Sequence, residues 1–400
     1  MFDPQQGLGL DPRMGFESQI QEALQELETA GLLRRPLRIS GPQGPDVEID
    51  GRPVICLCSN NYLGLAAHPA LAEAAANTAV REGSGSAASR LITGTMDAHR
   101  EAESAFAAFS GAPSATLFST GYAANLGTIQ ALVGPGDAVF SDALNHASLI
   151  DGCRLSRAKI HVYRHRDLDH LESLLRRQRG KARRALVVSD SLFSMDGVVA
   201  PVSELASLAR SFDAGFLVDE AHALGVFGPG GRGICAAEGV QPDIIVGTLG
   251  KSFGVAGAFV AASENVVSLI RNRARSFVYS TAPPPTTVRA ALAALPLVRD
   301  ADEARQTLLT HAARLRSGLR EQGFELLESQ SQILPVLIGE NNRTMRLSAE
   351  LLERGVFVQG IRPPTVPEGT ARLRLTPMAT HRTEQIDRAL EAFALLARQK

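Results

Sequence analysis

Short apolar runs rich in β-branched residues alternate with longer helix-like segments between about residues 61 and 281. Each run has the length and composition of a buried strand. The runs are SATLF (114–118), DAVFSD (137–142), KIHVYRH (159–165), RALVVSD (184–190), GFLVDE (215–220), DIIVGT (243–248) and GAFVAAS (257–263). Because amphipathic or alanine-rich segments separate several of them, the pattern predicts an α/β fold with a mostly parallel sheet wrapped by helices.

The flanking segments predict a second, smaller domain. The first ten or so residues have the composition of a loose tail, and residues 16–35 (FESQIQEALQELETAGLLRR) space their apolar positions as a helix does, with Gly31 near its end. After the prolines at 283–285, two long helical stretches lead to a strand at 333–338, another helix, strands at 355–361 and 372–376, and a final helix to Gln399. We therefore expect an N-terminal segment over 1–60, a large α/β domain over 61–285 and a small α+β domain over 286–400.

Composition narrows the classes of partner. The 41 Lys and Arg residues nearly balance the 42 Asp and Glu residues, so no overall field attracts nucleic acid or a membrane surface. The four cysteines include one C-x-C pair, Cys56 and Cys58, whose spacing is not typical of zinc sites. No metal centre is expected, and buried free thiols fit a reducing compartment. Without a signal-peptide pattern or an apolar run of ~18 residues, the sequence predicts a soluble, cytoplasmic protein.

Two glycine patterns resemble dinucleotide-binding loops. GPGGRG (228–233) matches G-x-G-x-x-G, and GSGSAA (83–88) matches its alanine-ended form. The fingerprint requires a preceding strand, a following helix and an acidic residue about 20 positions later. Neither pattern meets these requirements, so a NAD-binding oxidoreductase is the disfavoured alternative.

Three other motifs could carry chemistry, and each also has an ordinary structural explanation. STGYAANLGTIQAL (119–132) follows a strand and opens a helix, which creates an anion site or simply a capped glycine turn. FLVDEAHALG places Asp219 at the end of an apolar strand, where a carboxylate needs a cation or strong donors; a structural ion pair, a helix cap or a weak metal site with Glu220 and His222 would also satisfy it. His146 in LNHASLI could be a cap or a core histidine.

The stretch GTLGKSFG (247–254) adds a lysine, Lys251, which by itself could be a solvated loop residue. Taken together, the motifs supply a phosphate site, a carboxylate for a ring nitrogen, a ring to stack and an amine that can form an imine. Pyridoxal phosphate requires these four features.

The chain resembles the α-oxoamine synthase family, which are fold-type I pyridoxal-phosphate enzymes. The resemblance runs from about Arg34 to His381, through SNNYLGL, GSGSAASRLITG, STGYAAN, LNHASL, LFSMDG, VDEAHALGVFG, GTLGKSFGVAGAF and FVYSTAPPP. It implies that the protein condenses an amino acid with an acyl thioester and releases carbon dioxide. The late stretch IRPPTVPEGTARLRLT (361–376) resembles the family member of biotin biosynthesis, which uses L-alanine and a pimeloyl thioester on coenzyme A or an acyl carrier protein. A glycine C-acetyltransferase or another member of the family is the alternative.

The resemblance also implies roles around the cofactor ring. Lys251 would form the imine and later remove the α-proton as a base. Asp219 would pair with the ring nitrogen, His222 would bond the phenolic oxygen, His146 would stack on the ring face, and Ser194 would orient the ring.

Further roles concern the phosphate and the substrates. Gly121, Tyr122 and Thr248 would hold the phosphate, and the resemblance implies a homodimer in which Ser280 and Thr281 reach the phosphate of the second subunit. Among the substrate residues, Asn60 and Arg374 would bind the carboxylate of the amino acid, and Arg34 the phosphates of the thiol carrier. Independently of the resemblance, the paired prolines that follow Arg362 stiffen a loop that either borders the acyl site or simply joins two strands.

Two features fit less well. GSGSAAS has Ala87 and Ala88 where many relatives carry glycines, so the resemblance does not assign a role to this loop on the acyl side. The basic run RRQRGKARR (176–184) is either a solvated helix end or a docking site for a phosphate-bearing carrier.

Overall fold

The computed structural model describes residues 15–397, which form two compact units. The larger unit contains Asn60–Leu309 and Met378–Thr380. The smaller unit contains the chain up to Ser59, Thr310–Pro377 and the chain from His381 onward. The predicted N-terminal tail lies outside the described residues.

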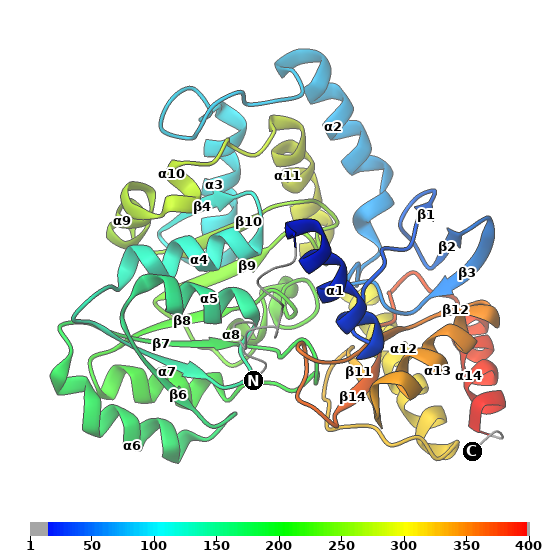
Figure 1. Cartoon of the computed structure of the whole chain (residues 1–400). Coiled ribbons are helices and arrows are strands. Elements are labelled where there is room, and N and C mark those ends of the chain that lie inside the picture. Colours follow the sequence, from blue (N-terminus) through cyan, green and yellow to red (C-terminus); the bar gives the residue numbers. More distant parts are fainter. Residues whose placement is uncertain (1–14, 398–400) are drawn as a thin grey trace. The chain divides into compact units, whose positions relative to one another are not determined.

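The larger unit is built on a mixed sheet (Figure 1). Within the described residues its seven strands follow the order β4-β10-β9-β8-β7-β5-β6. Their bounds are β4 (Ser114–Phe118), β5 (Ala138–Asp142), β6 (Lys159–Tyr163), β7 (Ala185–Asp190), β8 (Gly215–Asp219), β9 (Ile244–Thr248) and β10 (Ala258–Ala262). The strands from β9 to β6 pair in parallel, and β10 is antiparallel to both of its neighbours. The mostly parallel sheet predicted from the apolar runs is therefore confirmed.

Helices cover this sheet because the chain must cross over between parallel strands. Every residue of β5, β7 and β10 is buried, which explains why these strands show no polar alternation. In Figure 1, α4 and α5 lie side by side on the sheet. The helices of this unit are α2 (Pro69–Glu82), α3 (Asp97–Ser110), α4 (Gly121–Leu132), α5 (Ala147–Ser156), α6 (Leu168–Gln178), α7 (Val202–Ser211), α8 (Ile234–Ala237), α9 (Glu264–Arg273), α10 (Arg275–Val278) and α11 (Pro285–Arg299).

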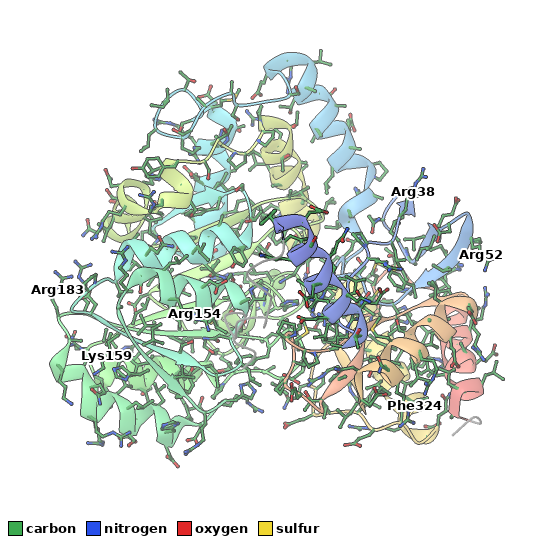
Figure 2. The ribbon with its side chains drawn as sticks, viewed as in Figure 1. Arg38, Arg52, Arg154, Lys159, Arg183 and Phe324 are labelled. Carbon is green, nitrogen blue, oxygen red and sulfur yellow. The ribbon has the colours of Figure 1, made fainter. Side chains whose placement is uncertain are left out.

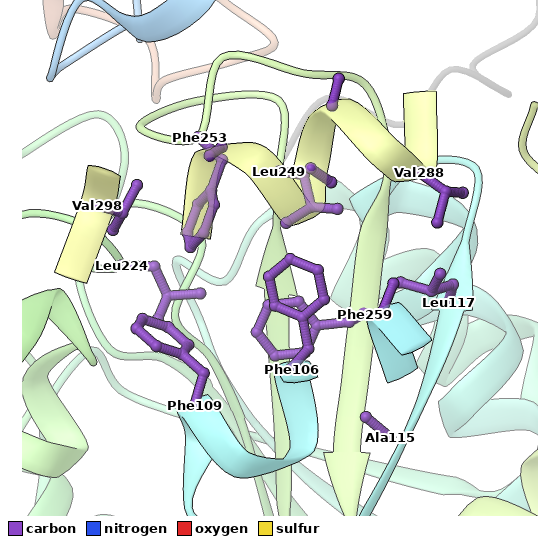
Figure 3. Close-up of a cluster of buried hydrophobic side chains, with 14 of the residues drawn as sticks. Phe106, Phe109, Ala115, Leu117, Leu224, Leu249, Phe253, Phe259, Val288 and Val298 are labelled. Carbon is purple, nitrogen blue, oxygen red and sulfur yellow. The ribbon is translucent and has the colours of Figure 1, made fainter. Parts of the chain in front are cut away.

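An aromatic cluster forms the core beside β10 (Figure 3). The Phe106 ring stacks on Phe259 with 4.8 Å between centroids, and Phe253 meets Phe106 edge-on at 5.7 Å. Leu249 and Phe253 belong to this cluster and are 3% and 0% exposed. Burying such side chains contributes about 1.5–3 kcal/mol each, so the loop between them is anchored at both ends.

The smaller unit contains two small sheets. One has the order β1-β2-β3-β12 and the other β11-β14-β13. In its core Phe324 meets Phe393 edge-on at 5.3 Å, and Figure 2 labels Phe324. The strands are β1 (Ile39–Ser40), β2 (Asp46–Ile49), β3 (Arg52–Cys56), β11 (Leu334–Gly339), β12 (Val356–Phe357), β13 (Gln359–Ile361) and β14 (Ala371–Leu375). The helices are α1 (Phe16–Thr29), α13 (Asn341–Glu353) and α14 (Thr383–Ala397), whose predicted end at Gln399 lies outside the described residues.

The two units divide at a different place from the predicted boundary near residue 286. The division falls inside α12 (Asp302–Glu321), and α11 belongs to the larger unit, where it packs on α2 and α3. The strand β3 pairs with β12, so the N-terminal strands belong to the smaller unit. No helix of residues 15–397 combines the length and the apolar composition needed to cross a membrane.

Candidate active site

Lys251 lies in a tight loop that follows β9. The main-chain N–H of Leu249 donates to the carbonyl of Gly257 at 2.9 Å, and the N–H of Gly254 donates to the carbonyl of Lys251 at 3.0 Å. Gly254 has a φ of +71°, and a Cβ there would lie 2.5 Å from the nitrogen of Ala66, so only glycine fits. With Leu249 and Phe253 buried on either side, the lysine is held by a rigid frame rather than by a mobile surface loop.

Two aspartates end neighbouring strands at the carboxyl edge of the sheet. Asp190 ends β7 and Asp219 ends β8, and the two residues pair in register. Both are buried, at 3% and 5% exposure. Burial raises the pKa of Asp190 well above its usual range, the Asp219 carboxylate raises it further, and Lys251 lowers it. Lys251 is therefore a cation that acts on Asp190.

The carboxylate of Asp219 accepts two short hydrogen bonds. Its Oδ1 accepts from the main-chain N–H of Ala221 at 2.8 Å, and its Oδ2 accepts from Nδ2 of Asn125 at 2.6 Å. The same Nδ2 of Asn125 donates to Oγ of Ser148 at 2.8 Å, and that hydroxyl lies 2.7 Å from Nδ1 of His146. Asp219 and His146 are thus connected by two intervening side chains.

His146 caps the N-terminus of α5 and remains exposed to solvent. Its main-chain N–H donates to Oδ2 of Asp190 at 2.7 Å. Desolvation by the surrounding protein is the main cause that lowers the pKa of His146. Asp219 and Asp151 raise this pKa, and Lys251 lowers it. His146, Asp190, Asp219 and Lys251 therefore share one electrostatic environment.

His222 lies three residues after Asp219 and is buried at 6% exposure. Its Nδ1 lies 2.7 Å from the hydroxyl of Tyr62, and this hydroxyl also lies 3.2 Å from Oδ1 of Asn60. Tyr62 is fully buried. The predicted residues His222 and Asn60 are thus brought to the same tyrosine.

The predicted phosphate site lies at the N-terminus of α4. Thr120 caps the helix by accepting the N–H of Ala123 at 3.0 Å, which leaves the amides of Gly121 and Tyr122 without an acceptor inside the helix. A Cβ at Gly121 would lie 3.4 Å from Oγ1 of Thr248. The structure therefore brings the three predicted phosphate residues together.

The Tyr122 side chain is 44% exposed, and its hydroxyl donates to Asp151.

Ser194 lies in the turn after β7, where the main-chain N–H of Phe193 donates to the carbonyl of Val198 at 3.0 Å.

Ser280 and Thr281 follow α10. Thr281 pairs with Ser89, and the N–H of Ala282 donates to the carbonyl of Ala88 at 2.9 Å. The GSGSAAS loop and the 280–283 segment therefore support each other.

Three of the predicted residues lie in the smaller unit, and two of them line a groove of about 800 Å³. Arg34 is exposed, whereas Arg362 is 6% exposed and its Nη2 donates to the carbonyl of Leu33 at 2.9 Å. Burial lowers the pKa of Arg362, and Arg34 lowers it further. Arg374 lies in β14, opposite Gln359 and outside the groove lining, and is 5% exposed.

The glycine patterns have structural roles. In GPGGRG, a Cβ at Gly233 would lie 2.6 Å from the carboxylate of Glu220. That carboxylate accepts hydrogen bonds from the hydroxyl of Ser191 at 2.7 Å and from the first two amides of α8 at 3.1 and 2.7 Å. Because these donors occupy its oxygens, Glu220 has a structural role instead of the weak metal-ligand role considered from the sequence. Neither pattern joins a strand to a helix, as a dinucleotide loop would.

The basic run is partly neutralised by acids of its own surface. Arg179 pairs with Asp213 at 2.7 Å, and Arg183, labelled in Figure 2, pairs with Asp137 at 3.0 Å. This arrangement favours the solvated helix end over a docking site.

Sequence reasoning missed four residues that touch the predicted ones. They are Tyr62, Asn125, Ser148 and Asp190. Asn125 could have been found, because it lies four positions after Gly121 on the same face of α4. Asp190 also ends a buried strand, as Asp219 does.

These residues fit the cofactor that the resemblance implies. A buried carboxylate with fixed donors suits a protonated ring nitrogen, and the open amides of α4 beside Thr248 suit a phosphate. The amine of Lys251, held by the tight loop after β9, is suited to form a bond with an aldehyde carbon.

Comparisons with known proteins agree with this chemistry. The family model for class I and II aminotransferases matches residues 52–393. A curated relative, 8-amino-7-oxononanoate synthase of Geobacter metallireducens, is 50% identical, over 94% of this chain and 97% of the relative. The same enzyme of Anaeromyxobacter dehalogenans is 50% identical, over 93% of each chain.

Solved structures with the same fold include a PLP-bound enzyme and an 8-amino-7-oxononanoate synthase. Serine palmitoyltransferase of S. paucimobilis with bound PLP and myriocin has a TM-score of 0.90 and 35% identity, covering 96% of this chain and 98% of its own. The 8-amino-7-oxononanoate synthase of Francisella tularensis has a TM-score of 0.75 and 29% identity, covering 86% and 98%. The cofactor is pyridoxal 5'-phosphate, and the chain belongs to the class I and II aminotransferase family, in the branch that contains the 8-amino-7-oxononanoate synthases.

Proposed function

We propose that the protein condenses L-alanine with a pimeloyl thioester, on coenzyme A or an acyl carrier protein, and releases carbon dioxide and the free thiol to give 8-amino-7-oxononanoate for biotin. The observation that carries the proposal is the buried Asp219, held by Asn125 in the larger unit that also places Lys251 and His146. The names of the curated relatives support the choice of substrates. We also propose a cytoplasmic location.

When bound, pyridoxal 5'-phosphate supplies an aldehyde that captures amines and a ring that accepts the electron pair of a carbanion. Asp219 would keep the ring nitrogen protonated through its carboxylate, because it lies in a dry site with fixed donors. Lys251 would hold the aldehyde carbon and, once displaced by alanine, its Nζ would accept the α-proton. Gly121, Tyr122 and Thr248 would hold the phosphate at the start of α4.

Other residues would orient the reactants. His222 would bond the phenolic oxygen, with its own ring fixed by Tyr62. His146 would cover the ring face, and Ser194 would orient the ring. Asn60 and Arg374 would bind the carboxylate of L-alanine, and Arg374 has the planar fork suited to that group.

The groove of the smaller unit supports a long acyl chain with a polar end. Apolar side chains line it, namely Leu33, Leu37, Ile39, Met345, Phe357 and Ile361. The Nε of Arg362 is buried without a hydrogen-bond partner, and an unpaired buried donor is costly. A carboxyl group at the far end of the acyl chain would accept a hydrogen bond from this Nε, whereas an acetyl group has no such carboxyl group. Arg34 on the same groove would meet the carrier.

A homodimer is part of the proposal. The helix α1 has no buried residue, and its apolar side chains Phe16, Ile20, Leu24 and Leu27 are 78%, 42%, 48% and 40% exposed at helical spacing. Such a stripe is usually covered. We assign its cover to a second copy of the chain, whose Ser280 and Thr281 would reach the phosphate.

Steady-state kinetics with the PLP-loaded protein test the function. L-alanine is paired with pimeloyl-CoA, pimeloyl-carrier protein and acetyl-CoA, and glycine with acetyl-CoA, and the products are identified by mass. We expect pimeloyl thioesters to exceed acetyl-CoA by at least ~100-fold in kcat/KM, since each buried methylene contributes about 0.8 kcal/mol. A faster reaction of glycine with acetyl-CoA would assign the protein as a glycine C-acetyltransferase instead.

A further inference from the structure

The Nδ1 atom of His146 lies within reach of two donors. The hydroxyl of Ser148 is 2.7 Å from it, and the main-chain N–H of Ser148 donates to it at 3.2 Å. An N–H can only donate, so Nδ1 acts as an acceptor toward this group.

The direction of the Ser148 hydroxyl follows from Asn125. The Nδ2 group of Asn125 has two hydrogens, one donated to Oδ2 of Asp219 at 2.6 Å and one to Oγ of Ser148 at 2.8 Å. Since Oγ of Ser148 accepts there, its single hydrogen is available for Nδ1 of His146. The proton of a neutral His146 ring then lies on Nε2.

Asp219 fixes the orientation of the amide. If the Asn125 side chain were flipped, its carbonyl oxygen would face the carboxylate of Asp219, and two acceptors would meet. In the observed orientation Oδ1 of Asn125 is buried without a hydrogen-bond partner. The two donated bonds, one of them to a charged group, outweigh this loss.

The charges around His146 come from several elements. Asp219 ends β8, Lys251 follows β9, Asp151 lies on α5, and Asp190 of β7 accepts the main-chain N–H of His146. Desolvation and Lys251 lower the pKa of His146, while Asp219 and Asp151 raise it.

We propose that Asn125 and Ser148 are positioning residues that, anchored on Asp219, fix the direction of the hydrogen bonds to His146, hold its ring in one orientation and keep its proton on Nε2. The consequence for catalysis rests on the proposed function. A neutral ring stacked on a protonated cofactor adds no second positive charge, so the electron-accepting ring keeps its partner without electrostatic repulsion.

Ring-nitrogen NMR of ¹⁵N-histidine protein, recorded without substrate, tests the inference directly. The His146 signals are assigned with His146→Gln. In wild type we expect an unprotonated Nδ1 and a protonated Nε2. Ser148→Ala keeps the main-chain N–H to Nδ1 but loses the shorter bond from the hydroxyl, so it should shift the Nδ1 signal, and Ser148→Thr, which keeps the hydroxyl, should restore the wild-type signals. A proton on Nδ1 in wild type, or unchanged signals in Ser148→Ala, would overturn the proposal.

Ser156→Ala is the matched control, because Ser156 is another buried serine of α5 and bonds the carbonyl of Cys153 at 2.6 Å. It should leave the His146 signals unchanged. In kinetics, Ser148→Ala should lower kcat about tenfold with the KM for L-alanine within about twofold. The nitrogen spectrum requires no turnover, so a protein that shows the Nε2 proton but does not condense alanine refutes the proposed function alone.

Discussion

Ala87 has a left-handed backbone with a φ of +57°, a conformation that costs an L-residue with a Cβ about 1–2 kcal/mol. Its neighbour Ala88 is not among the residues with positive φ. We therefore predict opposite effects at adjacent positions: Ala87→Gly should stabilise the protein, and Ala88→Gly should destabilise it.

The magnitudes follow from the backbone and from burial. Ala87 is exposed, so its methyl group contributes little packing. Glycine relieves about 1–2 kcal/mol of strain, but it makes the unfolded chain more flexible at a cost of about 0.4–1 kcal/mol. The net gain for Ala87→Gly is about 0.5–1 kcal/mol. At Ala88 only the entropic loss remains, so the two variants should differ by about 1–2 kcal/mol.

Urea unfolding followed by circular dichroism measures both variants, with refolding checked for reversibility. We expect the midpoint of Ala87→Gly above wild type and that of Ala88→Gly below it, with unchanged slopes. Changes in this loop should affect stability, because the carbonyl of Ala88 accepts the N–H of Ala282 at 2.9 Å. Equal decreases in both midpoints would show that Ala87 is not strained.

Four further predictions concern catalysis, assembly and pH. Lys251→Ala should fold, lose the absorption band of the bound cofactor and lower kcat by orders of magnitude. Arg362→Met should lower kcat/KM for the pimeloyl thioester about 10–100-fold but leave heptanoyl thioester unchanged, whereas Arg35→Met, an exposed neighbour paired with Glu28, should change neither. Mixing Lys251→Ala chains with Thr281→Ala chains should restore activity, because one site of each mixed dimer is intact; no recovery would refute the shared site. Burial lowers the pKa of His99, so the folded state binds fewer protons than the unfolded chain between that value and about 6.5. Stability should rise with pH in this window, and His99→Gln should flatten the rise in urea midpoints.

The strands of the larger unit were predictable because burial on both faces produces continuous β-branched runs. Each predicted run contains an observed strand, with ends that differ by at most two residues. The antiparallel pairing of β10 with β9 is what their short, helix-free connection permits, because a parallel pair needs a longer crossover. The pairing of β10 with β4 was not predictable, since a buried run looks alike in either direction. The division inside α12 was also hidden, because a helix that continues across a boundary has no break in composition.

The candidate site was predictable only as a set of separate motifs. The sequence places Lys251, Asp219 and His146 at strand ends or helix starts, where parallel strands expose side chains. It cannot show that Asn125 lies between Asp219 and Ser148, because the hydrogen bonds join residues 94 and 23 positions apart. Residues that position a catalytic side chain through a hydrogen bond, such as Asn125 and Ser148, are therefore missed even where the catalytic side chain itself is found.

Strand order explains why this edge of the sheet can hold a cation. RALVVSD and GFLVDE each end in an acidic residue next to an apolar run, but only the pairing of β7 with β8 places Asp190 and Asp219 side by side. Burial and the neighbouring Asp219 carboxylate both raise the pKa of Asp190, so its ionised form needs a nearby positive charge. Lys251 supplies one such charge through its loop after β9, the next strand of the same sheet. A protonated cofactor ring beside Asp219 would supply another, so binding of the cofactor should favour the ionised form of Asp190.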